Sequence, residues 1–356
     1  MVSVYIELKQ NMIHNATIND LDKEDVSLWN KMGIRASMLL RREGRLALYL
    51  AASVILAPAL SAQQDTQQSM YWASPTAYNP ATAGSDSALH VTAFDRMQWV
   101  GVKGAPQTFF VSADMPVMLG HKRTGVGVSV LNDQAGLFTT TLVNAQLDYS
   151  LKLWGGRLAI GVQPGFVNQT FDGGGVFIPT GEAWDSSDEA IPSGEVSGMA
   201  FDLGAGAYYE WHRFYAGFAA QHLLSSQVEL DEYAYTEFAP TFYFHAGGNI
   251  PLKRTLFILQ PSVLIKSTFQ FTQYDLTLRT LWNHKFWGGM TWRPGDAMVV
   301  MVGADIDHIR LGYAYDIPLS QMSLAGGGSH EILATYTMHI DLDKSKKRGT
   351  KSIRIL

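Results

Sequence analysis

The chain has 356 residues, of which 47% are hydrophobic, 12% aromatic and only 17% charged, below the roughly one quarter that is usual for soluble domains. It contains 33 glycines and no cysteine, which excludes disulfides, thiolate metal sites and a cysteine nucleophile. The formal net charge of −5 argues against a nucleic-acid partner.

An apolar stretch near the start has the form of an export signal. Arginines within residues 41–45 precede a hydrophobic run over residues 46–60, and Ala62 then provides a cleavage point. Because a leader normally begins at its basic region, we predict a signal peptide over residues 38–62 and place residues 1–37 outside the fold. The run is too short for a membrane-spanning helix, and a buried helix is the alternative.

Short segments of alternating apolar and polar residues follow from Ser87 onward, without a long helical period. In "TQYDLTLRTLW", Leu276 and Leu278 share a face that ends at Trp282, opposite Asp275 and Arg279. A membrane-crossing strand needs about 9–11 residues and gains from an aromatic ring at the headgroup level. Fourteen such candidates lie at residues 88–99, 107–115, 124–132, 137–151, 157–166, 197–210, 213–222, 241–249, 255–265, 268–281, 285–292, 297–305, 308–316 and 329–342.

The connections between these segments alternate in length. They are mostly short and often basic after even-numbered candidates, and several are long after odd-numbered ones, notably the acidic intervals 167–196 and 223–240. Short periplasmic turns and long outer loops are typical of outer-membrane barrels, and a closed barrel leaves no backbone edge in lipid.

The sequence therefore predicts an all-β fold, a transmembrane outer-membrane β-barrel of about 14 antiparallel strands over residues 87–342. An N-terminal periplasmic segment over residues 63–86 would precede it, and a basic tail over residues 343–356 would follow. A large soluble sandwich or jelly roll stays as the alternative, because alternation is a weak signal in any single segment.

The tail is strongly cationic. A run of like charges is usually a solvated end, and the functional hypothesis is a periplasmic arm for an acidic partner. Its basic residues are Lys344, Lys346, Lys347, Arg348, Lys351 and Arg354.

No catalytic or metal-binding pattern emerges from the remaining polar residues. His330 and Glu331 lack the second histidine of a zinc-protease motif, and the Asp305–His308 cluster falls at a predicted turn, where aspartate is ordinary. The glycine-rich segments lack the Lys-Ser/Thr pair of a phosphate loop, and no nucleophile elbow is present. The sequence predicts no enzyme, no cofactor and no metal site.

Several stretches together resemble the PorP/SprF family, outer-membrane proteins of the type IX secretion system in Bacteroidetes. They are "YNPATAG" at 78–84, "DRMQWVGVKGAPQT" at 95–108, "GVGVSVLNDQAG" at 125–136, "LQPSVLIK" at 259–266 and "YAYDIPLSQMSLAGGGSHEI" at 313–332. The motif positions within them are Asn79, Pro80, Gly84, Arg96, Gln98, Trp99, Gly101, Gly104, Pro106, Asn132, Asp133, Gly136, Asp316, Ser329, His330 and Glu331. The resemblance covers residues 63–342, and residues 1–37 and the basic tail depart from the family pattern.

The resemblance implies an exported protein of the cell outer membrane with no catalytic residue. Such a barrel would work with a periplasmic lipoprotein or motor-linked components to secrete or anchor large surface proteins, including gliding adhesins. The implied partners are outer-membrane lipid, those secretion components and an adhesin client. A passive porin or small-solute transporter on the same fold is one alternative, and a soluble exported β-sandwich binding protein is another.

The first and last strands of a closed barrel are neighbours, so "DRMQW" should lie beside "GSHEI". Alternation along the strand directs Met97 and Trp99 toward lipid. It directs both Arg96 and Glu331 into the lumen. Because partly desolvated charges need partners, we predict that Arg96 meets Glu331 or Asp316 there. Asp95 has the lipid-facing parity, so we expect it above the hydrocarbon or at a bulge.

Overall fold

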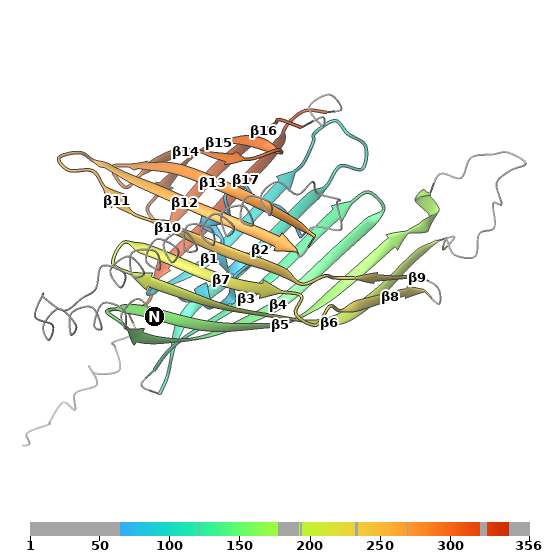
Figure 1. Ribbon diagram of the computed structural model, residues 1–356, viewed down its shortest axis with the longest axis horizontal. Helices are drawn as coiled ribbons and strands as arrows, with labels where there is room; N and C mark the ends of the chain where they lie inside the picture. Colours follow the sequence, from blue (N-terminus) through green and yellow to red (C-terminus); the bar gives the residue numbers. More distant parts are fainter. Residues whose placement is uncertain are drawn as a thin grey trace, which may run out of the picture. The chain divides into compact units, whose positions relative to one another are not determined.

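The computed structural model describes residues 65–341, except 121, 177–191, 193, 232–233, 269 and 321–325. Its main sheet consists of fourteen long strands and the two-residue β11, all paired antiparallel in sequence order. The sheet closes on itself, because β1 pairs with β17 and β10 pairs with β12 (Figure 1). The predicted all-β outer-membrane barrel of about 14 strands is thus confirmed. Residues 1–37, the signal peptide and the basic tail lie outside the described residues.

The strands in chain order are β1 (Ala88–Met97), β2 (Gln107–Leu119), β3 (Lys122–Ala135), β4 (Phe138–Leu153), β5 (Gly156–Asp172), β6 (Glu195–Trp211), β7 (Phe214–Gln221), β8 (Gln227–Asp231), β9 (Ala234–Glu237), β10 (Thr241–Gly248), β11 (Ile250–Pro251), β12 (Phe257–Thr268), β13 (Phe271–Trp282), β14 (Phe286–Arg293), β15 (Ala297–Ile306), β16 (Ile309–Pro318) and β17 (Ser329–His339). Each of the fourteen predicted segments overlaps one barrel strand. The prediction missed β11 and the hairpin β8–β9, which lies within the acidic interval 223–240.

The two faces of the wall have opposite chemistry. Outward positions are apolar and exposed, as in the last strand, where Ile332 is 53% and Tyr336 43% exposed. Inward positions of the same strand are buried, including Glu331 at 1%. A soluble sandwich buries its apolar faces, whereas a membrane barrel turns them toward lipid. The inside-out pattern therefore excludes the sandwich alternative.

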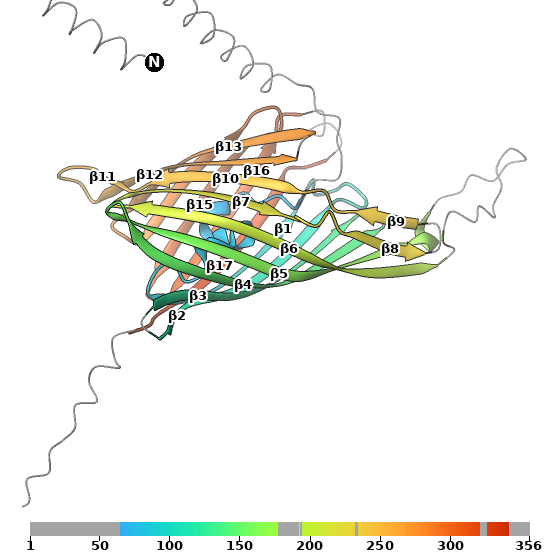
Figure 2. The same ribbon diagram turned by 60° about the horizontal axis from the view of Figure 1, so that its bottom comes forward.

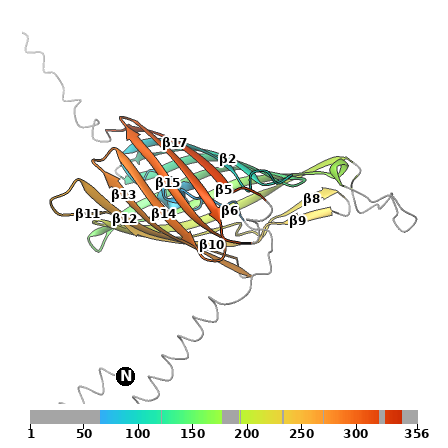
Figure 3. The ribbon, with the colours of Figure 1, turned by 90° about the horizontal axis from the view of Figure 1, so that it is seen from above.

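The barrel has two distinct ends. We call the end with the short connections, such as those after Leu119, Leu153 and Trp211, the turn end, and the opposite end the loop end. Exposed aromatic rings gather at the turn end, among them Trp154, Trp211, Phe257, Trp282 and Phe286. Aromatic girdles of this kind mark the membrane interface of outer-membrane barrels. Figure 3 shows the wall from β12 to β17 as a row of tilted strands.

At the loop end, the hairpin β8–β9 adjoins the long strands β5 and β6 (Figure 2). Val228 and Leu230 of the hairpin pack on Val167 in a small apolar cluster. Gly198 of β6 permits this approach, because a Cβ atom there would collide with the backbone carbonyl of Glu229. The hairpin thus covers part of the loop end from the inside.

Residues 65–86 lie inside the barrel. They form three short 3₁₀ turns, η1 (Tyr71–Ala73), η2 (Pro75–Ala77) and η3 (Pro80–Thr82), whose side chains are largely buried. The sequence-based boundary had made residues 63–86 a periplasmic segment, and the observed location differs because inward-facing wall residues bind this stretch. We call residues 65–86 the plug. Among the described residues, no helix is long and apolar enough to cross a membrane.

Candidate functional site

The plug runs along the lumen from the loop end to the turn end. At its start, Gln67 donates a hydrogen bond to Asp296, which lies in a loop-end connection, at 3.1 Å. At its end, the backbone N–H of Gly84 donates to Asp114 at 2.9 Å, and the Gly84 carbonyl accepts from Arg123 near the turn end. The chain then enters β1. The contacts between plug and wall form the candidate functional site.

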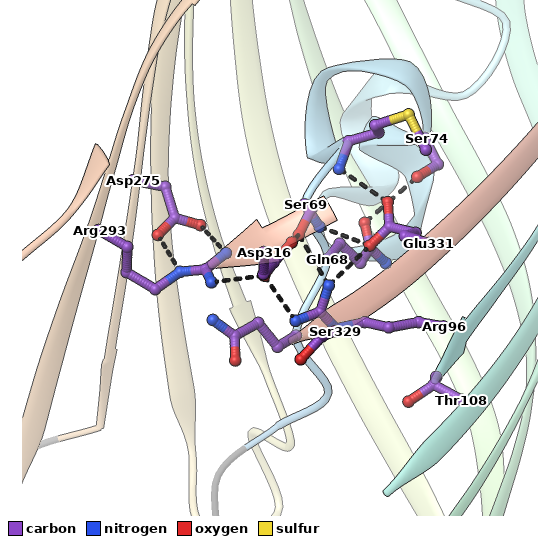
Figure 4. Close-up of polar contacts among 12 residues, drawn as sticks. Gln68, Ser69, Ser74, Arg96, Thr108, Asp275, Arg293, Asp316, Ser329 and Glu331 are labelled. Carbon is purple, nitrogen blue, oxygen red and sulfur yellow. Dashed lines mark hydrogen bonds and ion pairs between the residues drawn. The ribbon is translucent and has the colours of Figure 1, made fainter. Parts of the chain in front are cut away.

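Arg96 of β1 lies at the centre of the first contact region (Figure 4). Its guanidinium donates to Asp316 at 2.8 Å, to Glu331 at 3.3 Å and to the hydroxyl of Ser69 at 2.7 Å. The register places Arg96 directly opposite Glu331 across the β1–β17 seam. The predicted pairing of the first and last strands and the predicted ion pair are both confirmed. Arg96 contacts both candidate carboxylates.

The plug donates further hydrogen bonds to this cluster. The backbone N–H groups of Ser69 and Met70 donate to the two oxygens of Glu331 at 2.6 and 2.8 Å, and the Ser69 hydroxyl donates to Asp316 at 2.6 Å. A buried carboxylate needs such donors, because losing water costs it several kcal/mol.

A second arginine extends the cluster around the wall. Arg293 of β14 donates to Asp275 at 2.8 Å and to Asp316 at 3.0 Å (Figure 4). It also lies 3.3 Å from Asp296. Two arginines thus face three buried carboxylates, those of Asp275, Asp316 and Glu331. The backbone amides of the plug supply Glu331 with two donors in addition to Arg96.

The N-terminal end of the plug has its own ionic contacts. His222, in the connection after β7, lies 3.0 Å from Asp65 and 2.9 Å from Asp202. Burial disfavours the charged ring, but the two carboxylates prevail and raise the pKa of His222 to about 10. Asp65 also accepts from the hydroxyl of Tyr243 at 2.7 Å, and its carbonyl accepts from Lys266. This end is therefore bound to the connection after β7, to β10 and to β12, and His222 in turn binds Asp202 of β6.

The "YNPATAG" motif makes the contacts of the other half of the plug. Asn79 caps η3, with Pro80 at the first position of the turn, and its side chain accepts from Ala81 N–H at 3.0 Å. The Asn79 amide also donates to the Ala207 carbonyl of β6 at 3.2 Å. Gln221 of β7 donates to the Tyr78 carbonyl at 3.0 Å. These motif residues bind the plug to the barrel wall.

Glycines in the wall make room for this half of the plug. Side chains would collide with the backbone of Ala83 at Gly125, with Ala81 at Gly161 and with the Asn79 amide at Gly206. These glycines occupy inward positions on β3, β5 and β6. Glycine is therefore required at these positions, because the plug lies too close to the wall to leave room for a side chain.

The plug leaves one chamber on each side. The loop-end chamber, of about 460 Å³, is lined mainly by polar residues and reaches Asp65 and the hairpin residue Glu237. The turn-end chamber, of about 250 Å³, includes Trp72 and Arg279.

The motif residues between β1 and β2 do not contact the plug. They form hydrogen bonds within and between connections at the loop end. Trp99 N–H donates to the Ser329 hydroxyl at 3.3 Å, and the Gln98 N–H donates to the Pro106 carbonyl at 2.9 Å. Gly101 and Gly104 have φ of +99° and +71°, a conformation that side chains disfavour. Trp99 leaves the strand with φ +42°, so its predicted orientation toward lipid is not retained: it is half-buried in the loop.

The β3–β4 connection joins the same assembly. Gly136 N–H donates to the Gly104 carbonyl at 3.0 Å, and Asp133 accepts from Thr108 at 2.6 Å. Asn132 donates to Thr141 at 2.9 Å within its own hairpin.

Two polar residues lie near the loop ends of β17 and β1. His330 points outward and forms a hydrogen bond with the hydroxyl of Tyr313 at 2.7 Å. Asp95 stays in regular register opposite Ile332 and Phe109, so the bulge that we considered is not formed. Asp95 accepts a hydrogen bond from Gln107 near the loop end.

The sequence missed Ser69, Met70, Asp275 and Arg293 as members of the Arg96 cluster. The alternation along its strand placed Asp275 on the inward face, and a charged residue in a lumen needs a partner. Nothing in the local pattern indicated that backbone amides of residues 69–70 would enter the barrel. Over the residues that the structure describes, no group of three or more His, Asp or Glu side chains is arranged to hold a metal ion. The tail cations named above lie outside the described residues.

Comparison with known proteins identifies relatives of this architecture. A family model described as "Type IX secretion system membrane protein PorP/SprF" matches residues 60–336. Similar solved structures include a Pseudomonas aeruginosa FadL homologue, with 11% identity, a TM-score of 0.41, and coverage of 74% of this chain and 93% of that one. The Acinetobacter baumannii outer membrane protein Omp33 is similar at 8% identity and a TM-score of 0.41, over 71% of this chain and 99% of its own. No curated protein sequence matches the chain.

Proposed function

The chain belongs to the PorP/SprF family of type IX secretion system membrane proteins, and we propose that it helps this system to secrete large surface proteins, such as gliding adhesins, or to anchor them at the cell surface. The observation that supports this role over that of a passive porin is the plug. A porin needs a water-filled lumen, whereas here residues 65–86 are bound along the lumen by buried ion pairs and hydrogen bonds.

The proposed orientation follows from the two ends. Short turns face the periplasm in outer-membrane barrels and longer loops face outward, so the turn end would meet a periplasmic lipoprotein or motor-linked component. The loop end would meet the secreted client. Export through the signal peptide over residues 38–62 belongs to the same proposal, and a mature N-terminus at Gln63 in membrane-extracted protein would support it.

We assign the protein a non-enzymatic role. The buried charged residues that would attract attention in an enzyme, Arg96, Arg293, Asp316 and Glu331, are engaged with one another and with the plug. Their arrangement serves to hold a segment of chain in place.

Deletion of the gene tests the proposal. We expect general permeability to small solutes to stay almost unchanged while a large adhesin disappears from the cell surface, and complementation with the intact gene should restore display. Normal surface display of every type IX client, together with slowed uptake of small solutes, would reject this role and favour the porin.

The basic tail has a separate test. If its six cations form a periplasmic arm, a chain truncated after Leu342 will fold but retain periplasmic partners less well, and the loss will grow at high salt because attraction between exposed charges is screened. Equal retention by the truncated and full chains would identify the tail as an inert solvated end.

A further inference from the structure

Arg279 of β13 differs from the other arginines that face the lumen. Arg96 and Arg293 pair with buried carboxylates, and Arg310 forms a bidentate pair with Asp305 at 2.8 and 2.7 Å. Among the described residues, Arg279 has no carboxylate within ion-pair distance and no hydrogen-bond acceptor. Its guanidinium instead lies 3.2 Å from the ring centre of Trp72, in the plug.

The turn-end chamber surrounds this guanidinium. Its lining includes the aromatic residues Trp72, Tyr208 and Tyr215, besides Arg279 and Arg310, and none of the described residues that line it is Asp or Glu. Because Asp305 already neutralises Arg310, the charge of Arg279 is the one left uncompensated in the chamber. A half-buried cation of this kind attracts an anion, and the planar guanidinium with its five donors fits a carboxylate in a bidentate pair.

The size of the chamber and the end at which it opens restrict the kind of ligand further. The volume of about 250 Å³ holds roughly eight water molecules at about 30 Å³ each, which is room for one acidic side chain but not for a folded domain. Asn249, Gly248 and Ser85, which border the chamber, belong to the turn end. A ligand group would therefore enter from that end.

The rim of the turn end carries more exposed basic residues than acidic ones. Among the described residues of this rim, the exposed basic ones are Lys122, Lys152, Arg213, Lys253, Arg254 and Lys285, and the exposed acidic ones are Asp86, Glu210, Asp307 and Asp341. A segment rich in carboxylates would be attracted first by this rim and then by the unpaired cation behind it.

We propose that the turn-end chamber is a docking site for an acidic peptide segment of a partner protein, which inserts one carboxylate to pair with Arg279 against Trp72. The inference deepens the proposed function, since it gives the chemistry by which a partner on the periplasmic side would be recognised. The bidentate pair gives two of the Arg279 donors an acceptor and leaves the stacking of the guanidinium on Trp72 in place.

The test measures peptide binding to the purified protein in detergent. The probe is a capped octapeptide of alternating glutamate and glycine, with the matched glutamine peptide as the uncharged control. We expect the glutamate peptide to bind and the glutamine peptide not to bind. Arg279→Gln should weaken binding about tenfold or more, which is the range for loss of a hydrogen-bonded ion pair.

Two further variants separate pairing from net charge and from folding. Arg213→Gln removes one exposed cation from the same end and should change affinity less than twofold. Arg279→Lys keeps the positive charge but lacks the two parallel N–H donors of the guanidinium. Its affinity for the glutamate peptide should lie between those of the wild type and Arg279→Gln. A difference in electrophoretic mobility between unheated and heated samples (heat-modifiable migration) checks that each barrel is folded.

Several results would overturn the proposal. These are equal losses for Arg279→Gln and Arg213→Gln, equal binding of the two peptides, or no binding at all. Displacement of the peptide by inorganic phosphate at concentrations where acetate has no effect would also overturn it and indicate a phosphate-bearing ligand. Because this assay does not depend on secretion, its failure is distinguishable from failure of the gene-deletion test.

Discussion

Arg96 is the residue on which the first plug contact depends, because it meets two carboxylates and a plug hydroxyl at once. Replacing it by glutamine leaves the buried Asp316 and Glu331 short of positive charge. Breaking a buried ion pair in this way typically costs about 3–5 kcal/mol. We expect Arg96→Gln to lower the free energy of unfolding in detergent by that order and to make residues 65–86 accessible to protease.

The control for Arg96 is Arg157→Gln. Arg157 pairs with Glu210 at 2.9 Å, but the glutamate side chain is 46% exposed. Exposed pairs contribute about 0–1 kcal/mol, so this variant should behave nearly as the wild type. Similar losses of stability in the two variants would contradict the central place of Arg96.

His222 predicts a pH dependence for the N-terminal end of the plug. Despite burial, its contacts with Asp65 and Asp202 raise its pKa from an ordinary value near 6.5 to about 10. A group whose pKa is raised by folding stabilises the fold fully below its unfolded pKa, and this contribution is lost as the pH rises to the folded value. Protease cleavage near Asp65 should therefore be slow at pH 6, increase between pH 7 and 10, and be fastest above pH 10.

The variant His222→Gln isolates this group. The protease should cleave this variant near Asp65 at the same elevated rate across the pH range, because the variant has no imidazolium charge at position 222 to lose. A pH profile unchanged from that of the wild type would assign the effect to other groups near Asp65, such as Tyr243 or Lys266.

At the residue scale, sequence parity was enough to pair Arg96 with Glu331 and Asp316, since period-2 alternation fixes which side chains enter a lumen. The same rule does not reveal the donors of Ser69 and Met70. Their contribution comes from backbone N–H groups, which every residue has, so no side-chain pattern could identify them.

At the scale of elements, the strands were predictable and the plug was not. Each barrel strand alternates between lipid and lumen, whereas η1, η2 and η3 are single turns enclosed on all sides and show neither strand nor helix period. A usable signal was present in the wall: glycines at inward positions of β3, β5, β6 and β7 leave space that another segment must fill.

Gly206 tests this relation between wall and plug. A Cβ atom in Gly206→Ala would collide with the amide of Asn79 and lie 3.1 Å from the Cβ of Ala219. Overpacking of this kind costs about 1–3 kcal/mol, so we expect the η3 region to detach and its amide hydrogens to exchange faster. Gly288→Ala is the matched control, because its nearest neighbour would be the Met301 carbonyl at 3.6 Å. Equal exchange in both variants would mean that the wall glycines do not position the plug.

At the scale of the whole molecule, the plug connects parts of the barrel that are far apart in sequence. Its first half binds β1, β16 and β17 through the Arg96 cluster, and its second half binds β2, β6 and β7. It thus crosses the lumen from one wall to the other and separates the two chambers. This arrangement predicts a barrel that does not conduct ions until the plug is removed.

We therefore expect the intact protein in a planar bilayer to show almost no conductance, and a variant lacking residues 65–84 to conduct steadily. Arg96→Gln should conduct intermittently, since it weakens one attachment of the plug and leaves the others. Heat-modifiable migration again establishes that each barrel is folded before conductance is compared. Large, stable conductance of the intact protein would show that the plug does not close the lumen, and the case against a passive porin would lose its main support.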